Sequence, residues 1–213
     1  MKKKLVVFDF DGVILDSVAE HKKRYDFVYA SFGKKCPAKT IAQWRKWHDS
    51  KWERNFTRLG IKGKQLDAAI GRYWHGFEYK KSKPFKGIKK VLEIFAVKYT
   101  LAIVSNTKRK AVEDSLSKYG LSKFFVCVEG GNHKSGKIKR LQGVLRKCNE
   151  KAENAVIIGD TPADIRAGKA LGVKTIGVLY GWSTREKIYK EKPDAIALKP
   201  SDIPKLVEKL FNG

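Results

Sequence analysis

Acidic side chains stand where two apolar runs of this chain end. The first run leads into Asp9 and Asp11, and a later run leads into Asp160 and Asp164. Residues two apart in a strand project to the same side, so a strand through this segment would hold Asp9 and Asp11 together. Clustered carboxylates favour a hard divalent cation such as Mg²⁺, which binds one or two carboxylates, waters and a substrate phosphate. Alternatively, each aspartate caps the helix that follows it.

Short apolar runs recur along the chain, and most are followed by the pattern of an amphipathic helix. Apolar residues at i, i+3, i+4 and i+7 over residues 88–95 give one such helix. Near-continuous apolar strands that alternate with helices indicate a parallel sheet covered on both faces, so the predicted fold is a doubly wound α/β domain. The predicted strands are residues 4–10, 100–105, 124–128, 155–160, 173–178 and 194–198.

In such a sheet, ligands bind beyond the carboxyl ends of the strands, near the point where the strand order reverses. Ser105 and Asn106 stand at the carboxyl end of the second predicted strand, as the aspartates stand at the ends of the first and fourth. We therefore expect a hydroxyl and a set of carboxylates on one rim of the sheet.

A helical insert interrupts the alternation of strands and helices. No strand pattern occurs between residues 17 and 83, where four of the five tryptophans lie. The predicted domains are a core made of residues 1–16 and 84–213 and a small all-helical domain made of residues 17–83. Residues 18–83 contain 17 Lys and Arg against 6 Asp and Glu. The tryptophans could form the core of this domain or contact a ligand.

The chain is strongly basic, with 46 Lys and Arg against 22 Asp and Glu and a formal net charge of +24. Such a charge favours anionic partners, either phosphorylated metabolites or nucleic acid. The three cysteines lack zinc-site spacing and suit a reducing compartment. No apolar run approaches the length of a membrane span, so we expect a cytoplasmic protein without membrane contact.

Three motifs in a fixed order resemble those of the haloacid dehalogenase superfamily of phosphohydrolases. They are DFDGVILDS at residues 9–17, SNT at residues 105–107 and GDTPADIRAG at residues 159–168, with a lysine before the last. Within that superfamily the chain resembles the branch of phosphoglycolate phosphatase and β-phosphoglucomutase. The resemblance covers essentially the whole chain and implies a Rossmann-like core with a helical cap inserted after the first strand.

The resemblance also implies roles for the acidic residues. Asp9 would be the nucleophile that forms an aspartyl-phosphate, and Asp11 would protonate the leaving group and then activate water. Mg²⁺ would be bound by the Asp9 carboxylate, the Asp11 backbone carbonyl and Asp160, with Asp164 beside it or holding its waters. Asp11 argues against a carbon–halogen substrate, because haloacid dehalogenases proper need no acid or base at this position.

The resemblance assigns phosphate binding to a second group of residues. Ser105 and the backbone amide of Asn106 would bind phosphoryl oxygens, and a lysine would complete the site. Lys137 is the expected lysine because it opens an amphipathic pattern, and Lys134 and Lys139 are the alternatives.

The expected function is that of a Mg²⁺-dependent phosphatase acting on a small phosphorylated metabolite. One alternative is a phosphosugar mutase on the same scaffold. Another is a protein that binds nucleic acid or removes phosphate from nucleic-acid ends, which the basic composition would favour. The sequence contains no recognised nucleic-acid-binding motif, and it makes no prediction of the oligomeric state.

Overall fold

The computed structural model describes residues 3–75, 77–79, 81–131 and 136–212. Lys134, the alternative to Lys137, lies outside the described residues. The chain divides into two compact units, one made of Met1–Asp16 and Lys83–Gly213 and the other of Ser17–Ser82. These are called the core unit and the helical unit below.

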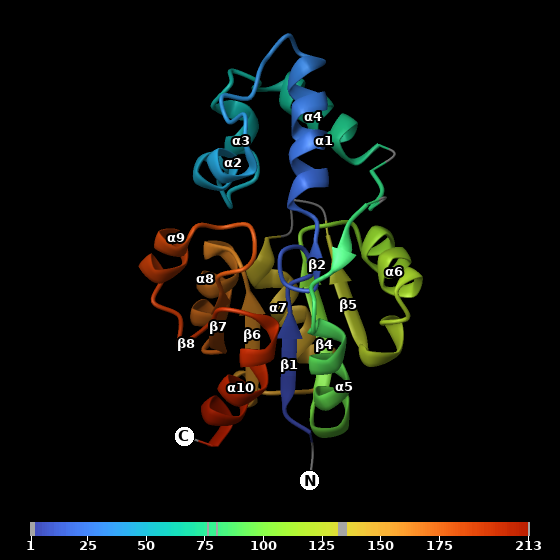
Figure 1. Cartoon of the computed structure of the whole chain (residues 1–213), viewed down its shortest axis with the longest axis vertical. Coiled ribbons are helices and arrows are strands. Elements are labelled where there is room, and N and C mark those ends of the chain that lie inside the picture. The colour runs from blue at the N-terminus through green and yellow to red at the C-terminus, as the bar shows by residue number, and fades with distance from the viewer. Residues whose placement is uncertain (1–2, 76, 80, 132–135, 213) are drawn as a thin grey trace. The chain divides into compact units, whose positions relative to one another are not determined.

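A six-stranded parallel sheet forms the centre of the core unit (Figure 1). Its strands are β1 (Leu5–Phe8), β4 (Thr100–Ser105), β5 (Cys127–Gly130), β6 (Ala155–Gly159), β7 (Lys174–Val178) and β8 (Ala195–Ala197). The spatial order is β5-β4-β1-β6-β7-β8, so the strand order reverses between β1 and β6. The structure confirms the predicted doubly wound α/β fold, and it places the switch point between these two strands.

Helices cover both faces of this sheet, as parallel strands require. On the face toward the viewer in Figure 1, α5 (Ile88–Lys98) packs beside α10 (Ile203–Asn212), and α7 (Lys137–Lys147) packs beside α8 (Pro162–Leu171) on the other face. The helix α6 (Arg109–Lys118) packs against β5, and α9 (Arg185–Lys190) packs against β7 and α8. Single 3₁₀ turns occur at Ser122–Phe124, Ala152–Asn154 and Pro200–Asp202. None of the helices in the described part of the chain is long and apolar enough to cross a membrane.

The register of the central strands explains the apolar runs of the sequence. Phe8 pairs with Ile103 of β4 and with Ile158 of β6, and every residue of β1 is buried. Side chains from both faces of these strands are therefore in the core, which removes the alternation of apolar and polar residues. One core cluster combines Leu5, Val7, Ala102, Val104 and Ile157 with residues of α7 and α8.

One predicted strand is displaced along the sequence. Residues 124–128 were expected to be extended, but β5 begins at Cys127, after the 3₁₀ turn at Ser122–Phe124. The aromatic ring of Phe125 packs against Phe8 with ring centroids 6.2 Å apart. Phe125 therefore belongs to the apolar run because it packs on the core, although it lies before the strand.

The junction between the units contains a small element that the sequence pattern did not predict. The strand β2 (Leu15–Asp16) pairs antiparallel with β3 (Lys83–Pro84). Two-residue strands contain too few residues for a detectable period. The pairing brings the outgoing and returning segments of the chain together where residues 17–82 are inserted.

The described residues of the helical unit form four helices with an aromatic core: α1 (Val18–Ala30), α2 (Ile41–Trp47), α3 (Arg54–Thr57) and α4 (Lys64–Trp74). Trp44 is fully buried, and its ring lies 5.7 Å from Tyr25, which also contacts Phe56 and Tyr73. Trp52 packs on Phe56 with centroids 4.9 Å apart. At least two of the tryptophans therefore serve the core of this unit.

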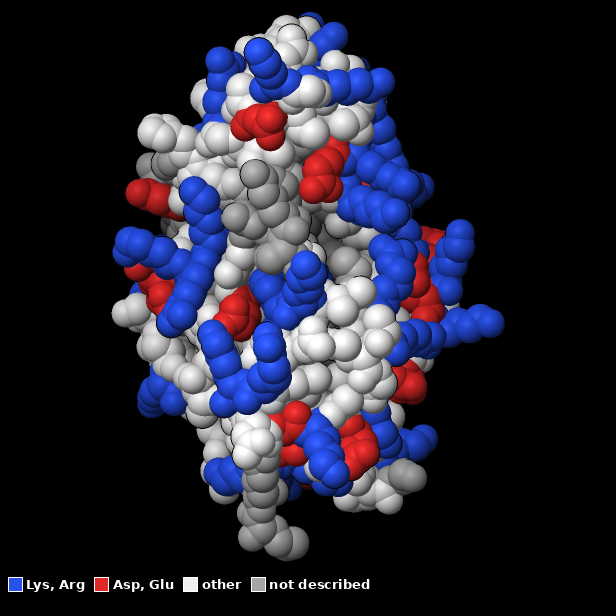
Figure 2. Space-filling model, turned by 180° about the vertical axis from the view of Figure 1, so that it is seen from behind, with Lys and Arg blue, Asp and Glu red and all other residues white. Residues whose placement is uncertain are grey.

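On the face shown in Figure 2, Lys and Arg side chains are spread over both units, with fewer Asp and Glu between them. Some of the basic side chains form short-range ion pairs with acidic neighbours on the same helix, such as Lys110–Asp114 and Arg109–Glu113. Exposed pairs of this kind add little stability, so the charge influences mainly solubility and anion attraction.

We expect Ile157→Ala to destabilise the core unit by about 2–5 kcal/mol, because it opens a cavity in a fully buried central strand. Val97→Ala is the matched control, since Val97 is 75% exposed and should change stability by no more than about 0.5 kcal/mol. Urea unfolding followed by circular dichroism compares the midpoints. Equal midpoints for the two variants would contradict the proposed core.

Candidate active site

The two central strands deliver the first two carboxylates of the site. Asp9 directly follows β1 and Asp160 directly follows β6, on adjacent strands at the switch point. The backbone N–H of Asp9 donates to the carbonyl of Ile158 at 2.9 Å, which continues the pairing of the strands. The N–H of Phe10 donates to Asp9 Oδ1 at 2.7 Å and fixes the orientation of that carboxylate.

The third carboxylate belongs to the first turn of α8. Asp164 Oδ2 accepts hydrogen bonds from Thr161 N at 3.0 Å and from Thr161 Oγ1 at 2.6 Å. Asp164 thus caps its helix, as the sequence analysis considered, but its other oxygen faces the site. Sequence reasoning assigned no role to Thr161, although a threonine three residues before an acid at a helix start is a recognised capping signal.

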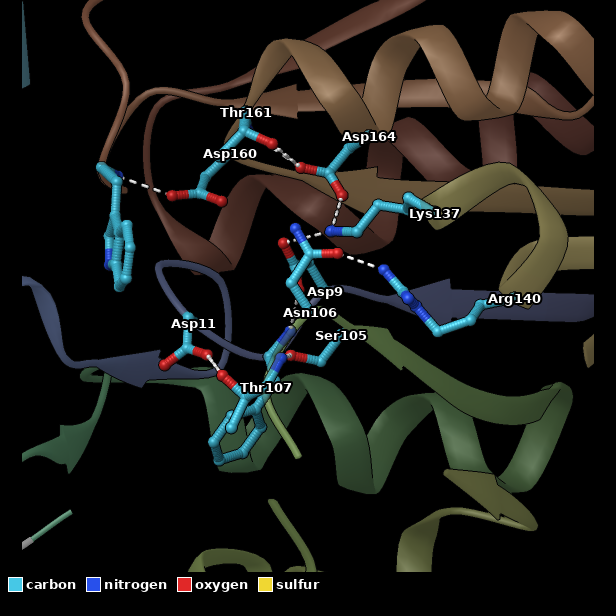
Figure 3. Close-up of polar contacts among 12 residues, drawn as sticks. Asp9, Asp11, Ser105, Asn106, Thr107, Lys137, Arg140, Asp160, Thr161 and Asp164 are labelled. Atoms are coloured by element: carbon cyan, nitrogen blue, oxygen red, sulfur yellow. Dashed lines mark hydrogen bonds and ion pairs between the residues drawn. The ribbon is translucent and has the colours of Figure 1, made fainter. Parts of the chain in front are cut away.

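Lys137, the first residue of α7, links two of these acids (Figure 3). Its Nζ donates to Asp9 Oδ2 at 2.6 Å and also to Asp164 Oδ1. The side chains of all three residues are almost fully buried, at 4%, 7% and 0% exposed in that order for Lys137, Asp9 and Asp164. The structure therefore places the lysine favoured by the sequence at the centre of the acidic group.

Burial and mutual repulsion dominate the electrostatics of this cluster. Burial raises the pKa of Asp9 from 3.8 to about 8, Asp164 adds to the effect, and Lys137 opposes it. Burial also raises the pKa of Asp160 well above its usual range, and the charges of Asp9 and Asp164 raise it further. For Lys137, burial opposes the charged form, but attraction to Asp164 and Asp9 outweighs it and raises the pKa.

The arrangement of the three acids fits a metal ion. Oxygens of Asp9, Asp160 and Asp164 lie within 4.8 Å of one another. Asp160 Oδ2 accepts from the backbone N–H of Trp182 at 2.6 Å, whereas its buried Oδ1 has no hydrogen-bond partner among the described residues. A buried carboxylate oxygen without a hydrogen bond is destabilised by the loss of its water. Binding a cation would compensate this loss, so Asp160 Oδ1 is suited to be a metal ligand.

Two glycines allow the backbone to approach Asp160. A Cβ added to Gly12 would lie 1.9 Å from Asp160 Oδ2, and one added to Gly181 would lie 2.3 Å from Asp160 Cβ. Gly12 also has a φ of +78°, which residues with a side chain rarely adopt. The glycine of the DxDG segment is therefore required both by its conformation and by the carboxylate beside it.

Asp11 is not a member of this group of three acids, although its charge adds to the rise in the pKa of Asp9. The strand β1 ends at Phe8, so the alternation that would align Asp9 with Asp11 does not extend to Asp11. Asp11 Oδ2 instead accepts from Thr107 Oγ1 at 2.6 Å, and Figure 3 shows its carboxylate directed toward Thr107. The expected metal contact of Asp11 through its backbone carbonyl stays a prediction. Thr107 had been assigned no role from the sequence.

The segment after β4 brings the predicted phosphate-binding residues to the same rim. Ser105 is buried, and its Oγ accepts from the backbone N–H of Thr107 at 3.1 Å. The side-chain oxygen of Asn106 accepts from Nη2 of Arg140, a buried residue of α7. Sequence reasoning missed Arg140, although its position three residues after Lys137 places both on one side of the helix.

We expect Lys137→Met to destabilise the protein by about 3–5 kcal/mol, because it leaves two buried carboxylates without their shared cation. The loss should be larger at pH 8 than at pH 5. Without Lys137 the raised pKa of Asp9 rises further, so the folded variant binds more protons than the unfolded chain, and its stability falls as the pH rises between the two pKa values.

Urea unfolding of metal-free protein at the two pH values measures this effect. The control is Lys139→Met on the same helix, where the side chain is exposed and should change stability little at either pH. If the Lys137 variant has the same urea midpoint as the control at both pH values, the buried ion pairs do not contribute to stability.

Comparison with known proteins identifies the family of this chain. The sequence profile of the family described as haloacid dehalogenase-like hydrolase matches residues 6–178. A phosphoglycolate phosphatase of Vibrio parahaemolyticus is 27% identical and 96% of each chain is aligned, and one of Aquifex aeolicus is 35% identical over 60% of each chain.

Solved structures share the fold at lower identity. A haloacid dehalogenase-like family hydrolase from Streptococcus pneumoniae superposes with a TM-score of 0.86 at 21% identity, covering 97% of this chain and 99% of the other. A protein from Clostridium acetobutylicum described as a predicted phosphatase gives a TM-score of 0.87 at 19% identity, covering 98% of this chain and 100% of the other. With the acidic site at the switch point and a profile match over most of its length, the chain belongs to the haloacid dehalogenase-like hydrolases, in their phosphoglycolate phosphatase-like branch.

Proposed function

We propose that this protein is a Mg²⁺-dependent phosphatase that hydrolyses a small phosphorylated metabolite through an aspartyl-phosphate on Asp9. The observation that carries the proposal is the buried cluster at the switch point, where Lys137 bridges Asp9 and Asp164 and Asp160 Oδ1 has no partner among the described residues. This set offers a nucleophile, fixed positive charge and oxygen ligands for a cation within one site.

In the first step, an oxygen of Asp9 attacks the phosphorus atom and the bond from phosphorus to the ester oxygen breaks. The attack requires the carboxylate form of Asp9, which burial alone disfavours. Asp9, Asp160 and Asp164 would hold Mg²⁺, which supplies positive charge that favours this carboxylate and offsets its repulsion from the phosphate. Lys137 keeps the Asp9 side chain in place through its 2.6 Å contact.

Asp11 would handle the proton in both steps. It gives a proton to the departing ester oxygen, and the product alcohol leaves. It then takes a proton from the water that attacks the phosphorus, and the bond to Asp9 breaks to release inorganic phosphate. The hydrogen bond from Thr107 to Asp11 and the ion pair of Lys137 with Asp9 give the two carboxylates different surroundings, which supports different roles for them.

The phosphoryl oxygens would be bound by Ser105, the backbone amide of Asn106 and Lys137. Ser105 and Asn106 come from the carboxyl end of β4, and Lys137 comes from the start of α7, where its Nζ contacts Asp9 (Figure 3). Fixed donors of this kind stabilise charge that develops during phosphoryl transfer.

The first substrate to test is 2-phosphoglycolate, because the relatives aligned over nearly all of this chain are phosphoglycolate phosphatases. A panel should also contain hexose phosphates and an oligonucleotide with a terminal phosphate. Interconversion of two sugar phosphates would favour the mutase alternative, and preference for the oligonucleotide would favour action on nucleic-acid ends.

With Mg²⁺, the protein should hydrolyse p-nitrophenyl phosphate, and Asp9→Asn should abolish turnover because the amide cannot act as the nucleophile. Asp11→Asn should lower kcat by about 10²–10⁴-fold through the loss of acid–base catalysis. Asp114→Asn, an exposed substitution on α6, is the control and should keep full activity. Full turnover by Asp9→Asn would refute the mechanism.

We expect Mg²⁺ to raise the melting temperature of the protein, and to raise it more at pH 8 than at pH 6. Burial raises the pKa of Asp9 to about 8, so at pH 6 protons compete with the cation for the same oxygen. In metal-free protein the folded state therefore binds more protons than the unfolded state, and stability falls as the pH rises from about 4 to about 8.

Differential scanning calorimetry with Mg²⁺ or with EDTA measures the shift. Mg²⁺ at 100 times its Kd adds about 2.7 kcal/mol. Asp160→Asn should lose the shift and Asp114→Asn should keep it. A shift of the same size in both variants would place the metal elsewhere.

A further inference from the structure

Arg140 is a buried cation that none of the roles assigned above uses. Only 5% of this residue is exposed, and it lies on α7 one turn after Lys137. Its Nη2 donates to the side-chain oxygen of Asn106, in the segment proposed to bind phosphate. Figure 3 shows the guanidinium approaching Asn106 from the side of α7, next to Lys137.

The position of Arg140 has an electrostatic cost. Burial lowers the pKa of Arg140, while the charges of Asp9, Asp164 and Glu129 favour its protonated form. A guanidinium stays protonated in proteins, so the site contains a second permanent positive charge in addition to Lys137. A buried charge is tolerated only where interactions within the site repay its desolvation.

The contact with Asn106 also constrains the segment after β4. Asn106 is half-buried, whereas its neighbours Ser105 and Thr107 are buried and joined by the bond from Thr107 N to Ser105 Oγ. Holding the Asn106 oxygen on Arg140 turns the side-chain NH₂ group away from the guanidinium. It also holds the side chain of Asn106 in one conformation beside the backbone amide that is proposed to bind phosphate.

We propose that Arg140 is a positioning and specificity residue that fixes Asn106 for phosphate binding and favours doubly charged phosphate monoesters. The proposal rests on the proposed function of the site. Two effects act together: the bond to Asn106 orders a donor, and the additional positive charge attracts a dianion more strongly than a monoanion.

The test measures steady-state hydrolysis of p-nitrophenyl phosphate and its inhibition by inorganic phosphate. Arg140→Gln should raise KM and the inhibition constant of phosphate about tenfold, equivalent to about 1.4 kcal/mol. It should also lower the preference for this monoester over bis(p-nitrophenyl) phosphate, a monoanion. Arg146→Gln is the matched control, an exposed arginine of the same helix, and should leave all three quantities unchanged.

A double-mutant cycle separates positioning from a structural contribution. If Arg140 acts through Asn106, Arg140→Gln with Asn106→Ala should raise the inhibition constant little more than Arg140→Gln alone does. Arg140→Lys keeps the buried charge but not the planar donor, so it should restore the preference for the monoester while the inhibition constant stays raised. This conservative variant also supplies the measurement if Arg140→Gln does not fold.

The outcomes distinguish this inference from the proposed function. If the wild-type protein with Mg²⁺ hydrolyses no phosphate ester and is not protected by phosphate, the proposed function fails. If the wild type is active but Arg140→Gln and Arg140→Lys match Arg146→Gln in KM, inhibition and ester preference, only the role of Arg140 is overturned. Additive effects in the cycle would likewise overturn its action through Asn106.

Discussion

The ion pairs of Lys137 with Asp9 and Asp164 are the constraint on which the rest of the core unit depends. Three carboxylates are buried within 4.8 Å of one another, and such a group is unstable without a cation. Buried ion pairs add little stability compared with an apolar replacement of similar size. The cluster is therefore better explained by what it binds than by what it stabilises.

The topology of the sheet makes this cluster possible. The strand order reverses between β1 and β6, so these two neighbouring strands end side by side. The loops that follow them leave in opposite directions and open a crevice where ligands bind. The register that pairs Phe8 with Ile158 brings Asp9 beside the segment leading to Asp160. The start of α7 supplies Lys137, which contacts Asp9 at the end of β1.

The two acids of the DxD segment lie in different surroundings despite their close spacing. Asp9 is held by Lys137 among other acids, whereas Asp11 is bonded to a neutral hydroxyl of Thr107. Carboxylates in different environments can exist in different protonation states at one pH, and a nucleophile and an acid–base group need this difference. The residues that follow β4 contact two other segments of the site: Thr107 donates to Asp11, and Asn106 accepts from Arg140 of α7.

The sequence by itself determined the fold class, the helical insert and the order of the motifs, because apolar period, composition and residue spacing are local properties. It also singled out Lys137, which opens the pattern of α7. Only the tertiary structure decided that β1 ends before Asp11, that β5 begins at Cys127, and that Thr107 and Arg140 contact the site. Strand ends depend on which neighbour supplies hydrogen bonds, and a contact such as that of Arg140 with Asn106 joins residues 34 positions apart. No local pattern encodes either of them, because both arise when the sheet and its helices pack.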